Sequence, residues 1–166
     1  HSALLSQASF ADGIRKLAAA GSQVIVDDIG YYDEPFFQDG IVAQAINEVA
    51  AAGVTYVSAA GNDASRSYEA LFNDADPGTA TDLHDFDPGA GIDTRQQVTV
   101  PAGYGAALIL QWDDPFFTTS GVTHDFNVRV YDAAGTLVKS GTTNNLATQQ
   151  PLEIVSWTGT ASGVFQ

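Results

Sequence analysis

The spacing of apolar residues near the amino end of the chain alternates between that of helices and that of strands. Ile14, Leu17 and Ala18 recur at helical intervals, so the pattern predicts a helix over residues 11–20. Ser9 is placed to cap this helix at its start. The glycine that follows the helix is a common helix stop.

A strand, a second helix and a second strand come next. Residues 23–27 form a nearly continuous apolar run, which is typical of a parallel strand covered on both faces. Residues 39–52 carry an apolar stripe at helical spacing, and residues 54–57 are strand formers. Strand, helix and strand with short joints are typical of a crossover between two parallel strands. The predicted fold of this part is a partial, doubly wound parallel α/β layer.

Two parallel strands cannot cover their own edges and faces. The pattern therefore predicts that the rest of the α/β layer lies outside this chain. It also predicts that the isolated chain exposes apolar surface and associates with a second copy.

Later in the chain the apolar positions alternate in short runs between turns rich in Gly, Asn and Asp, as antiparallel strands do. The expected strands are residues 97–100, 107–112, 127–131, 136–140 and 152–157. Residues 132–135 are expected to form a hairpin loop. The change of period divides the chain into an α/β part at 1–65, an acidic linker at 66–93 and an antiparallel β-sandwich at 94–166.

The composition excludes several classes of function. With 20 acidic against 6 basic residues the formal net charge is −14, whereas nucleic-acid binding needs clusters of Lys and Arg. The absence of cysteine excludes thiol catalysis. No apolar run is long enough for a membrane span, and we expect any export signal to lie outside this chain. An acidic, cysteine-free surface fits an exported bacterial enzyme, either secreted or held at the cell surface. It also suits calcium binding and simple solubility, and solubility is the commoner cause of such a charge.

The most informative stretch is residues 53–62, a strand that ends in Ala-Ala-Gly-Asn. Its small residues let another backbone lie alongside, and Asn62 is well placed to donate a hydrogen bond. An asparagine after a glycine is also a common turn pair, and both interpretations fit the residues. The ordered series over residues 1–62, helix, strand, helix and strand ending in Ala-Ala-Gly-Asn, resembles the subtilisin-like serine peptidases (subtilases).

The resemblance implies a role for each segment that follows a strand. In that family the asparagine donates into the oxyanion hole, where such a donor stabilises the developing charge by roughly 3–4 kcal/mol. This role falls to Asn62. The walls of the S1 pocket, which hold the backbone of a polypeptide substrate, fall to Asp28, Ile29 and Gly30 and to Ser58, Ala59, Ala60 and Gly61.

No segment supplies the catalytic Asp, His or Ser of that family. None of the histidines His1, His84 and His124 is followed by Gly-Thr. Residues 159–163, Gly-Thr-Ala-Ser-Gly, are a near miss for the serine motif and fit a sandwich loop better. Both later histidines precede an aspartate, but neighbours on an extended chain point to opposite sides, which argues against a catalytic dyad.

Because the catalytic triad is missing, the sequence predicts both the activity of this chain and its partner. We expect this chain to be inactive alone, since removing the nucleophile or base leaves only residual catalysis. The remainder of the catalytic domain is then its partner. In subtilases the serine follows the oxyanion asparagine, so the β-sandwich is expected to be an insertion between Asn62 and a serine beyond Gln166.

Asp28 stands where subtilases usually have a small serine. Three interpretations stay open. Together with Asp27, Asp33 and Glu34 it selects basic substrate side chains, or it binds a metal or accepts backbone hydrogen bonds, or it is simply solvated at a strand end.

Three stretches of the second half, residues 110–114, 125–132 and 135–138, resemble the jelly-roll domains that accompany secreted peptidases, called pre-peptidase C-terminal or P-like domains. Those domains often bind calcium through carboxylates near strand ends. The candidate calcium ligands are Asp113, Asp114, Asp125 and Asp132. The alternative is that these four aspartates are turn residues. The expected hydrolysis of peptides requires no cofactor.

Three classes of function follow from these patterns. The first is a fragment of an exported subtilisin-like endopeptidase. The second is a non-catalytic adhesion or carbohydrate-binding module, which an exposed aromatic face with Trp112 or Trp157 would favour. The third is a degenerate, structural homologue of subtilases.

Overall fold

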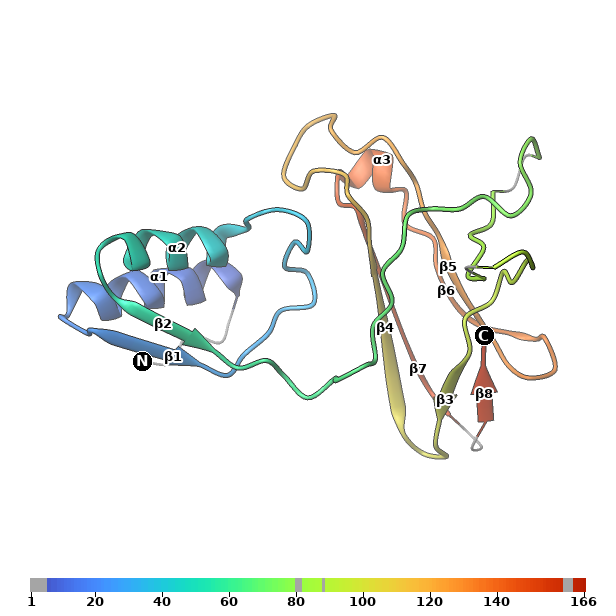
Figure 1. Ribbon diagram of the computed structural model, residues 1–166, viewed down its shortest axis with the longest axis horizontal. Coiled ribbons are helices and arrows are strands. Elements are labelled where there is room, and N and C mark those ends of the chain that lie inside the picture. The colour runs from blue at the N-terminus through green and yellow to red at the C-terminus, as the bar shows by residue number, and fades with distance from the viewer. Residues whose placement is uncertain (1–5, 80–81, 88, 160–162) are drawn as a thin grey trace. The chain divides into compact units, whose positions relative to one another are not determined.

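The computed structural model describes residues 6–79, 82–87, 89–159 and 163–166 (Figure 1). The chain forms two compact units, each assembled from separate stretches. The first unit comprises residues 1–66, 111–125 and 144–152, and the second unit comprises residues 67–110, 126–143 and 153–166. The fold is mixed α/β, with two helices and a parallel strand pair followed by antiparallel strand pairs. The three-part division at 65 and 93 stays a prediction.

The first helix, α1 (Gln7–Ala19), begins earlier than the sequence suggested. Ser6 is its N-cap, and the Ser6 hydroxyl accepts a hydrogen bond from the Ser9 amide at 3.2 Å. The prediction that Ser9 caps the helix is therefore wrong. Gln7 and Ala8 continue the helix backwards by most of a turn, and Ser9 takes the third helical position, whose free N–H needs a cap.

The crossover predicted from the sequence is confirmed. Strand β1 (Val24–Asp27) is followed by α2 (Ile41–Ala51) and β2 (Thr55–Ser58), and β1 pairs with β2 in parallel. Gly53, with φ +89°, ends the second helix and turns the chain into β2. The two helices are joined by Arg15, whose Nε and Nη2 donate to the Glu48 carboxylate at 2.6 and 2.8 Å.

Both helices pack on the same face of the strand pair, as Figure 1 shows. The core between them consists of Ala11, Ile14, Ile25, Val42, Ala45 and Val49. On the other face Val24, Val26 and Val57 are 59%, 70% and 49% exposed. No described segment of this unit buries that face, which agrees with the expectation that the chain by itself exposes apolar surface.

The strands of the antiparallel pairs lie close to their predicted positions. In the second half β3 (Val98–Val100) pairs with β8 (Gly163–Phe165), and β5 (Val128–Tyr131) pairs with β6 (Leu137–Gly141). Strand β4 (Gly105–Gln111) pairs with β7 (Leu152–Thr158). Among the described residues these pairs form separate two-stranded sheets, without a closed sheet. The jelly-roll arrangement stays a prediction.

The core of the second unit depends on strict alternation along the strands. Its buried members are Val100, Val130, Val155, Trp157 and Phe165. On β7 the buried face also contains Glu153, which is 2% exposed, while Ile154 faces outward. The Thr143 amide donates to the Glu153 carboxylate at 2.6 Å, so the buried acid satisfies a backbone donor.

A short helix, α3 (Asn145–Thr148), belongs to the first unit and was not predicted. The Asn144 side chain caps it by accepting from the Ala147 amide at 3.0 Å. None of the helices in the described part of the chain reaches the length and hydropathy that crossing a bilayer requires.

The stretch expected to be an acidic linker is organised around an aromatic cluster in the second unit. The His84 ring stacks edge-on against Phe86 at 4.6 Å and also lies against Tyr68 and Phe72. His84 Nδ1 accepts the Asn73 amide at 3.1 Å, and its Nε2 lies 3.1 Å from the Tyr68 hydroxyl. Side-chain contacts and an isolated antiparallel bridge between Asp74 and His84 therefore hold this stretch together.

Asp85 fixes the loop next to this cluster. It is 8% exposed, and one carboxylate oxygen accepts the amides of Asp87 and Asp93 at 3.0 and 2.8 Å. The backbone bonds from Asp93 and Asp87 hold the pKa of the Asp85 carboxyl below its usual range.

The open face of β1 and β2 predicts self-association of the isolated chain. The double change Val26→Thr with Val57→Thr should lower the binding of a hydrophobic dye and shift the mass from light scattering toward a monomer. The free energy of unfolding should change by less than about 0.5 kcal/mol per site, as is usual for exposed positions. Val49→Thr, the same change in the core, should cost about 1–3 kcal/mol. A wild-type monomer without dye binding would contradict the expectation.

The lowered pKa of Asp85 predicts a pH-dependent contribution to stability. A carboxyl with a depressed pKa in the folded state stabilises the fold above its unfolded pKa of about 3.9. That contribution disappears as the pH falls through the folded pKa. The gap in unfolding free energy between wild type and Asp85→Asn, measured with urea, should therefore be larger at pH 7 than at pH 3. The exposed neighbour Asp82, changed to Asn, is the control, and an equal gap at both pH values would refute the assignment.

Candidate functional site

The two segments singled out in the sequence leave the parallel sheet at the same edge. Asp27 is the register partner of Ser58, and the Ala59 amide donates to the Asp27 carbonyl at 3.1 Å. Residues 28–30 follow β1, and residues 58–62 run from the last residue of β2. We call these two segments the first and second wall. Both walls lie at the carboxyl end of the strand pair, where open α/β sheets bind ligands.

Asn62 is exposed at the end of the second wall, two residues beyond Ala60. Gly61 just before it has φ +74°, a backbone conformation that side chains other than glycine rarely adopt. Within the described residues the structure gives no hydrogen bond to the Asn62 side chain, so its amide N–H faces solvent. A Cβ added at Gly30 or Gly61 would meet no described atom within 4 Å, so open space lies beside both walls.

Asp27 joins the two strands at this edge by three hydrogen bonds. Besides the Ala59 amide at its carbonyl, its carboxylate accepts the Ser58 hydroxyl on one oxygen at 2.7 Å and the Tyr56 hydroxyl on the other. Burial of the phenol raises the pKa of Tyr56, and the bond and charge of Asp27 add to the shift.

The sequence suggested Asp27 only as one of several carboxylates near the cleft, and its hydrogen bonds to β2 were not predicted. Asp28 is exposed, whereas Asp27 is half-buried and engaged on both carboxylate oxygens. A signal was present, because residues 56 and 58 alternate onto one face of β2, and a polar pair there calls for a polar partner on β1.

The loop after the first wall is acidic and is held by a glutamine distant in sequence. Burial raises the pKa of Glu34, and the charges of Asp27 and Asp33 raise it further. Gln111 Oε1 accepts the Phe36 amide at 3.0 Å, and its Nε2 donates to the Glu34 carbonyl at 2.9 Å. One side chain therefore fixes the course of the loop, and nothing in the sequence singled it out.

The four acids considered as calcium ligands differ in their surroundings. Asp113 is exposed, and Asp125 accepts the Asn145 amide at 3.2 Å. Asp132 accepts the amides of Ala134 and Thr136 at 2.9 and 2.8 Å, in the hairpin loop that the sequence predicted.

Asp114 closes the loop between residues 112 and 124. One carboxylate oxygen accepts the amides of Thr123 and His124, both at 2.9 Å, and the Trp112 indole N–H at 3.2 Å. Burial alone would raise the pKa of Asp114, but the N–H donors of Thr123 and His124 bring it below its usual range.

Within the described residues no three His, Asp or Glu side chains gather as a metal site would require. Calcium binding therefore stays a prediction. The Asp114, Asp125 and Asp132 carboxylates serve as acceptors for backbone amides.

The hydrogen bonds given for the two described histidine rings involve groups other than the aspartate that follows each histidine. The His84 ring contacts Tyr68 and Asn73, and the His124 ring lies 3.1 Å from the Asp114 carboxylate and 3.2 Å from the Thr123 hydroxyl. His1 and residues 160–162 of the near-miss serine motif lie outside the described residues.

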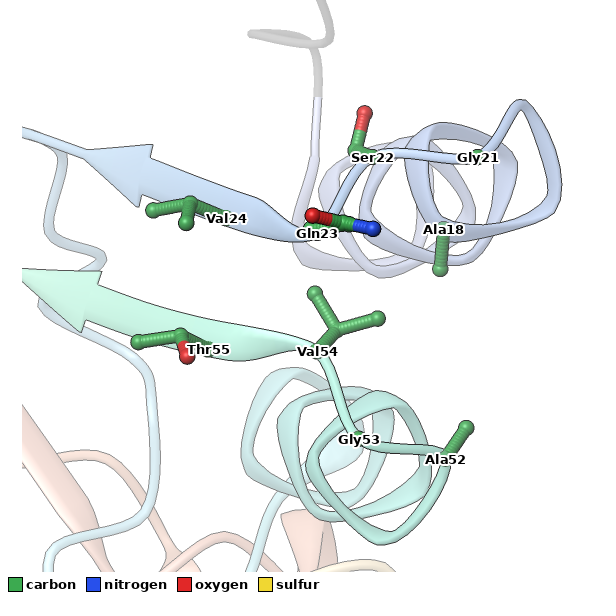
Figure 2. Close-up of a pocket in the computed structure, with 9 residues that line it drawn as sticks. All are labelled: Ala18, Gly21, Ser22, Gln23, Val24, Ala52, Gly53, Val54 and Thr55. Atoms are coloured by element: carbon green, nitrogen blue, oxygen red, sulfur yellow. The ribbon is translucent and has the colours of Figure 1, made fainter.

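The amino ends of the same two strands carry an open hollow, shown in Figure 2. It is lined by Ala18, Gly21, Ser22, Gln23, Val24, Ala52, Gly53, Val54 and Thr55. Its lining contains no acidic, basic or histidine side chain, so it offers none of the usual groups for general acid–base catalysis. The walls described above lie at the opposite edge.

Comparison of the chain with protein-family models, with curated proteins and with solved structures finds no match. The assignment of a function therefore depends on the geometry and on the residues themselves.

The geometry of Asp114 predicts its contribution to stability. Asp114→Ala removes the acceptor of two backbone amides and an indole N–H, so unfolding with urea should show a loss of about 1–3 kcal/mol. Asp113→Ala, at the exposed neighbour, should change the free energy of unfolding by less than about 0.5 kcal/mol. Equal losses for both variants would refute this role. Added calcium that stabilised the wild type but not Asp114→Ala would identify Asp114 as a metal ligand instead.

Proposed function

We propose that this chain is part of an exported subtilisin-like serine endopeptidase. It supplies the oxyanion asparagine, Asn62, and both walls of the S1 pocket, while the groups that break the bond lie outside it. The observation that carries the proposal is the common edge of the parallel pair, where residues 28–30 and 58–62 leave side by side and Asn62 ends the second wall exposed.

This arrangement supports the chemistry of peptide hydrolysis at one point. A peptide backbone lying between the walls would place its scissile carbonyl near the Asn62 amide. Attack on that carbonyl puts negative charge on its oxygen, and a positioned amide N–H stabilises that charge by roughly 3–4 kcal/mol. The chain contributes a donor and a binding surface and no nucleophile, so alone it is inactive.

The exposed face of β1 and β2 also supports a partial catalytic domain. Parallel sheets are normally covered on both faces, whereas here the second face exposes Val24, Val26 and Val57. The remainder of the catalytic domain, with further parallel strands and helices, is the partner that would cover this face in a doubly wound sheet.

For the second half of the chain we propose a jelly-roll-like β-sandwich inserted before the catalytic serine. The antiparallel pairs β3–β8 and β5–β6 support a sandwich of this kind. Calcium held by carboxylates near the strand ends belongs to the same proposal.

The alternative classes have less support. The adhesion or carbohydrate-binding alternative named Trp112 or Trp157 for an exposed aromatic face, and these two side chains are 9% and 8% exposed. Other rings, such as Tyr104 at 68%, are exposed. A degenerate, structural homologue would have the same walls and no triad anywhere in the full protein. The presence of Asp, His-Gly-Thr and Gly-Thr-Ser segments in the full-length protein separates the first class from the third.

The proposed role of Asn62 predicts the kinetics of a variant of the full-length protein. Asn62→Ala should lower kcat by about 10²–10³, because it removes a donor used in the transition state. KM for a peptide substrate should stay within about threefold, since the ground state gains little from this bond. Asp63, the exposed residue next to Asn62, provides the control. Asp63→Asn should leave kcat and KM unchanged. A loss of kcat below about tenfold would overturn the assignment.

A further inference from the structure

The walls are tied to each other through a single residue. Among the described residues, the hydrogen bonds that connect β1 to β2 at this edge end on Asp27: the Ala59 amide, the Ser58 hydroxyl and the Tyr56 hydroxyl. Beyond them the structure gives no hydrogen bond between residues 28–30 and residues 60–62. Asp27, the residue just before the first wall, therefore sets the separation of the two walls.

We propose that Asp27 is the positioning residue of the substrate-binding edge, and that its carboxylate sets the spacing of the two walls and the direction in which Asn62 leaves β2. This inference rests on the proposed function, because it gives the walls a polypeptide to hold. Asp27 acts through the walls, since both of its carboxylate oxygens already accept bonds from β2.

The geometry of these bonds is suited to that role. Tyr56 and Ser58 lie two residues apart on β2, so their hydroxyls reach the two oxygens of one carboxylate from the same face. Two bonds from different residues restrain both the distance between the strand ends and their relative twist. Bonds to an ionised group are also stronger than neutral ones.

The backbone pairing that leads into the walls is short. The parallel pair has four register positions, and its last backbone bond is that of the Ala59 amide. Short strand pairs fray at their ends, and a binding site must hold its groups within about 0.5 Å. A displacement of about 1 Å can lower a rate by roughly 10²-fold.

The first test uses the isolated chain and amide hydrogen exchange measured by NMR. Asp27→Ala should speed exchange of the Ala59 amide by about 10- to 100-fold, as expected when bonds to a charged group are lost. The amide signal of Asn62 should shift as well. Exchange within α2, for example at Ala45 in the core, should stay unchanged and shows that the unit is folded.

Two further variants separate positioning from general stability. Asp27→Asn keeps a planar group that can bond to both hydroxyls, so most of the Ala59 protection against exchange should return. This variant also keeps the test valid if Asp27→Ala does not fold. Asp12→Asn removes an exposed acid from α1 and should have no effect. Ala59 exchange and Asn62 shifts that match the wild type in Asp27→Ala would overturn the proposal.

The second test uses the full-length protein and a peptide substrate. Asp27→Ala should raise KM and lower kcat together by about tenfold or more each, while Asp27→Asn recovers most of both. A change of exchange in the chain together with unchanged kinetics would show that Asp27 positions the walls but that the walls do not bind substrate. That outcome would overturn the proposed function and this inference, whereas wild-type exchange in Asp27→Ala overturns the inference alone.

Discussion

In the first unit, helices cover only one face of the parallel strand pair, and this determines which strand residues are buried and which are exposed. Ile25 points into the layer below α1 and α2, and its neighbours Val24 and Val26 point away from it. A step of one residue along β1 thus separates a core position from an exposed one, as the twofold period of a strand requires. The pair gains its stability from the helical side, where the Arg15–Glu48 bridge and the apolar core hold α1 to α2. At its carboxyl end the pair depends on side-chain hydrogen bonds.

The order and type of the elements could be predicted because their signals are local. Apolar spacing gave both helices, and the apolar run gave β1. The start of α1 could not be fixed, because Ser6 and Ser9 stand three residues apart and either fits a cap by type. Which face of β1 this chain covers by itself could not be predicted, for a different reason. An apolar run shows that a strand suits burial on two faces, but whether a covering layer is present depends on segments far away in sequence or in another part of the protein.

The role of an aspartate depends on the atoms around its carboxylate, and the residue type alone does not predict those atoms. Asp114 and Asp132 stand near strand ends, where a calcium ligand and an acceptor for backbone amides have the same residue type. The two roles differ in the atoms that the carboxylate contacts. For Asp114 one such contact is the amide of His124, ten positions further along the chain. Asp27 is an example over a longer distance, because its partners on β2 lie 29 and 31 residues further along the chain. The resemblance to subtilases singled out the neighbouring Asp28, which the structure leaves exposed.

The two interpretations of Asn62, a turn residue or a donor for an oxyanion, differ in what the side chain should do. An asparagine that stabilises a turn accepts a backbone amide two residues on. This chain uses that device often, with Asp74, Asp85 and Asp93 each accepting the amide of the second residue after it. Within the described residues Asn62 makes no such bond, although it follows a glycine with positive φ in a turn-like conformation. A donor that serves an incoming substrate must keep its N–H unengaged, and the groups that hold it in place must already be satisfied. In the proposed function, the bonded Asp27 meets the second requirement and the unbonded Asn62 meets the first.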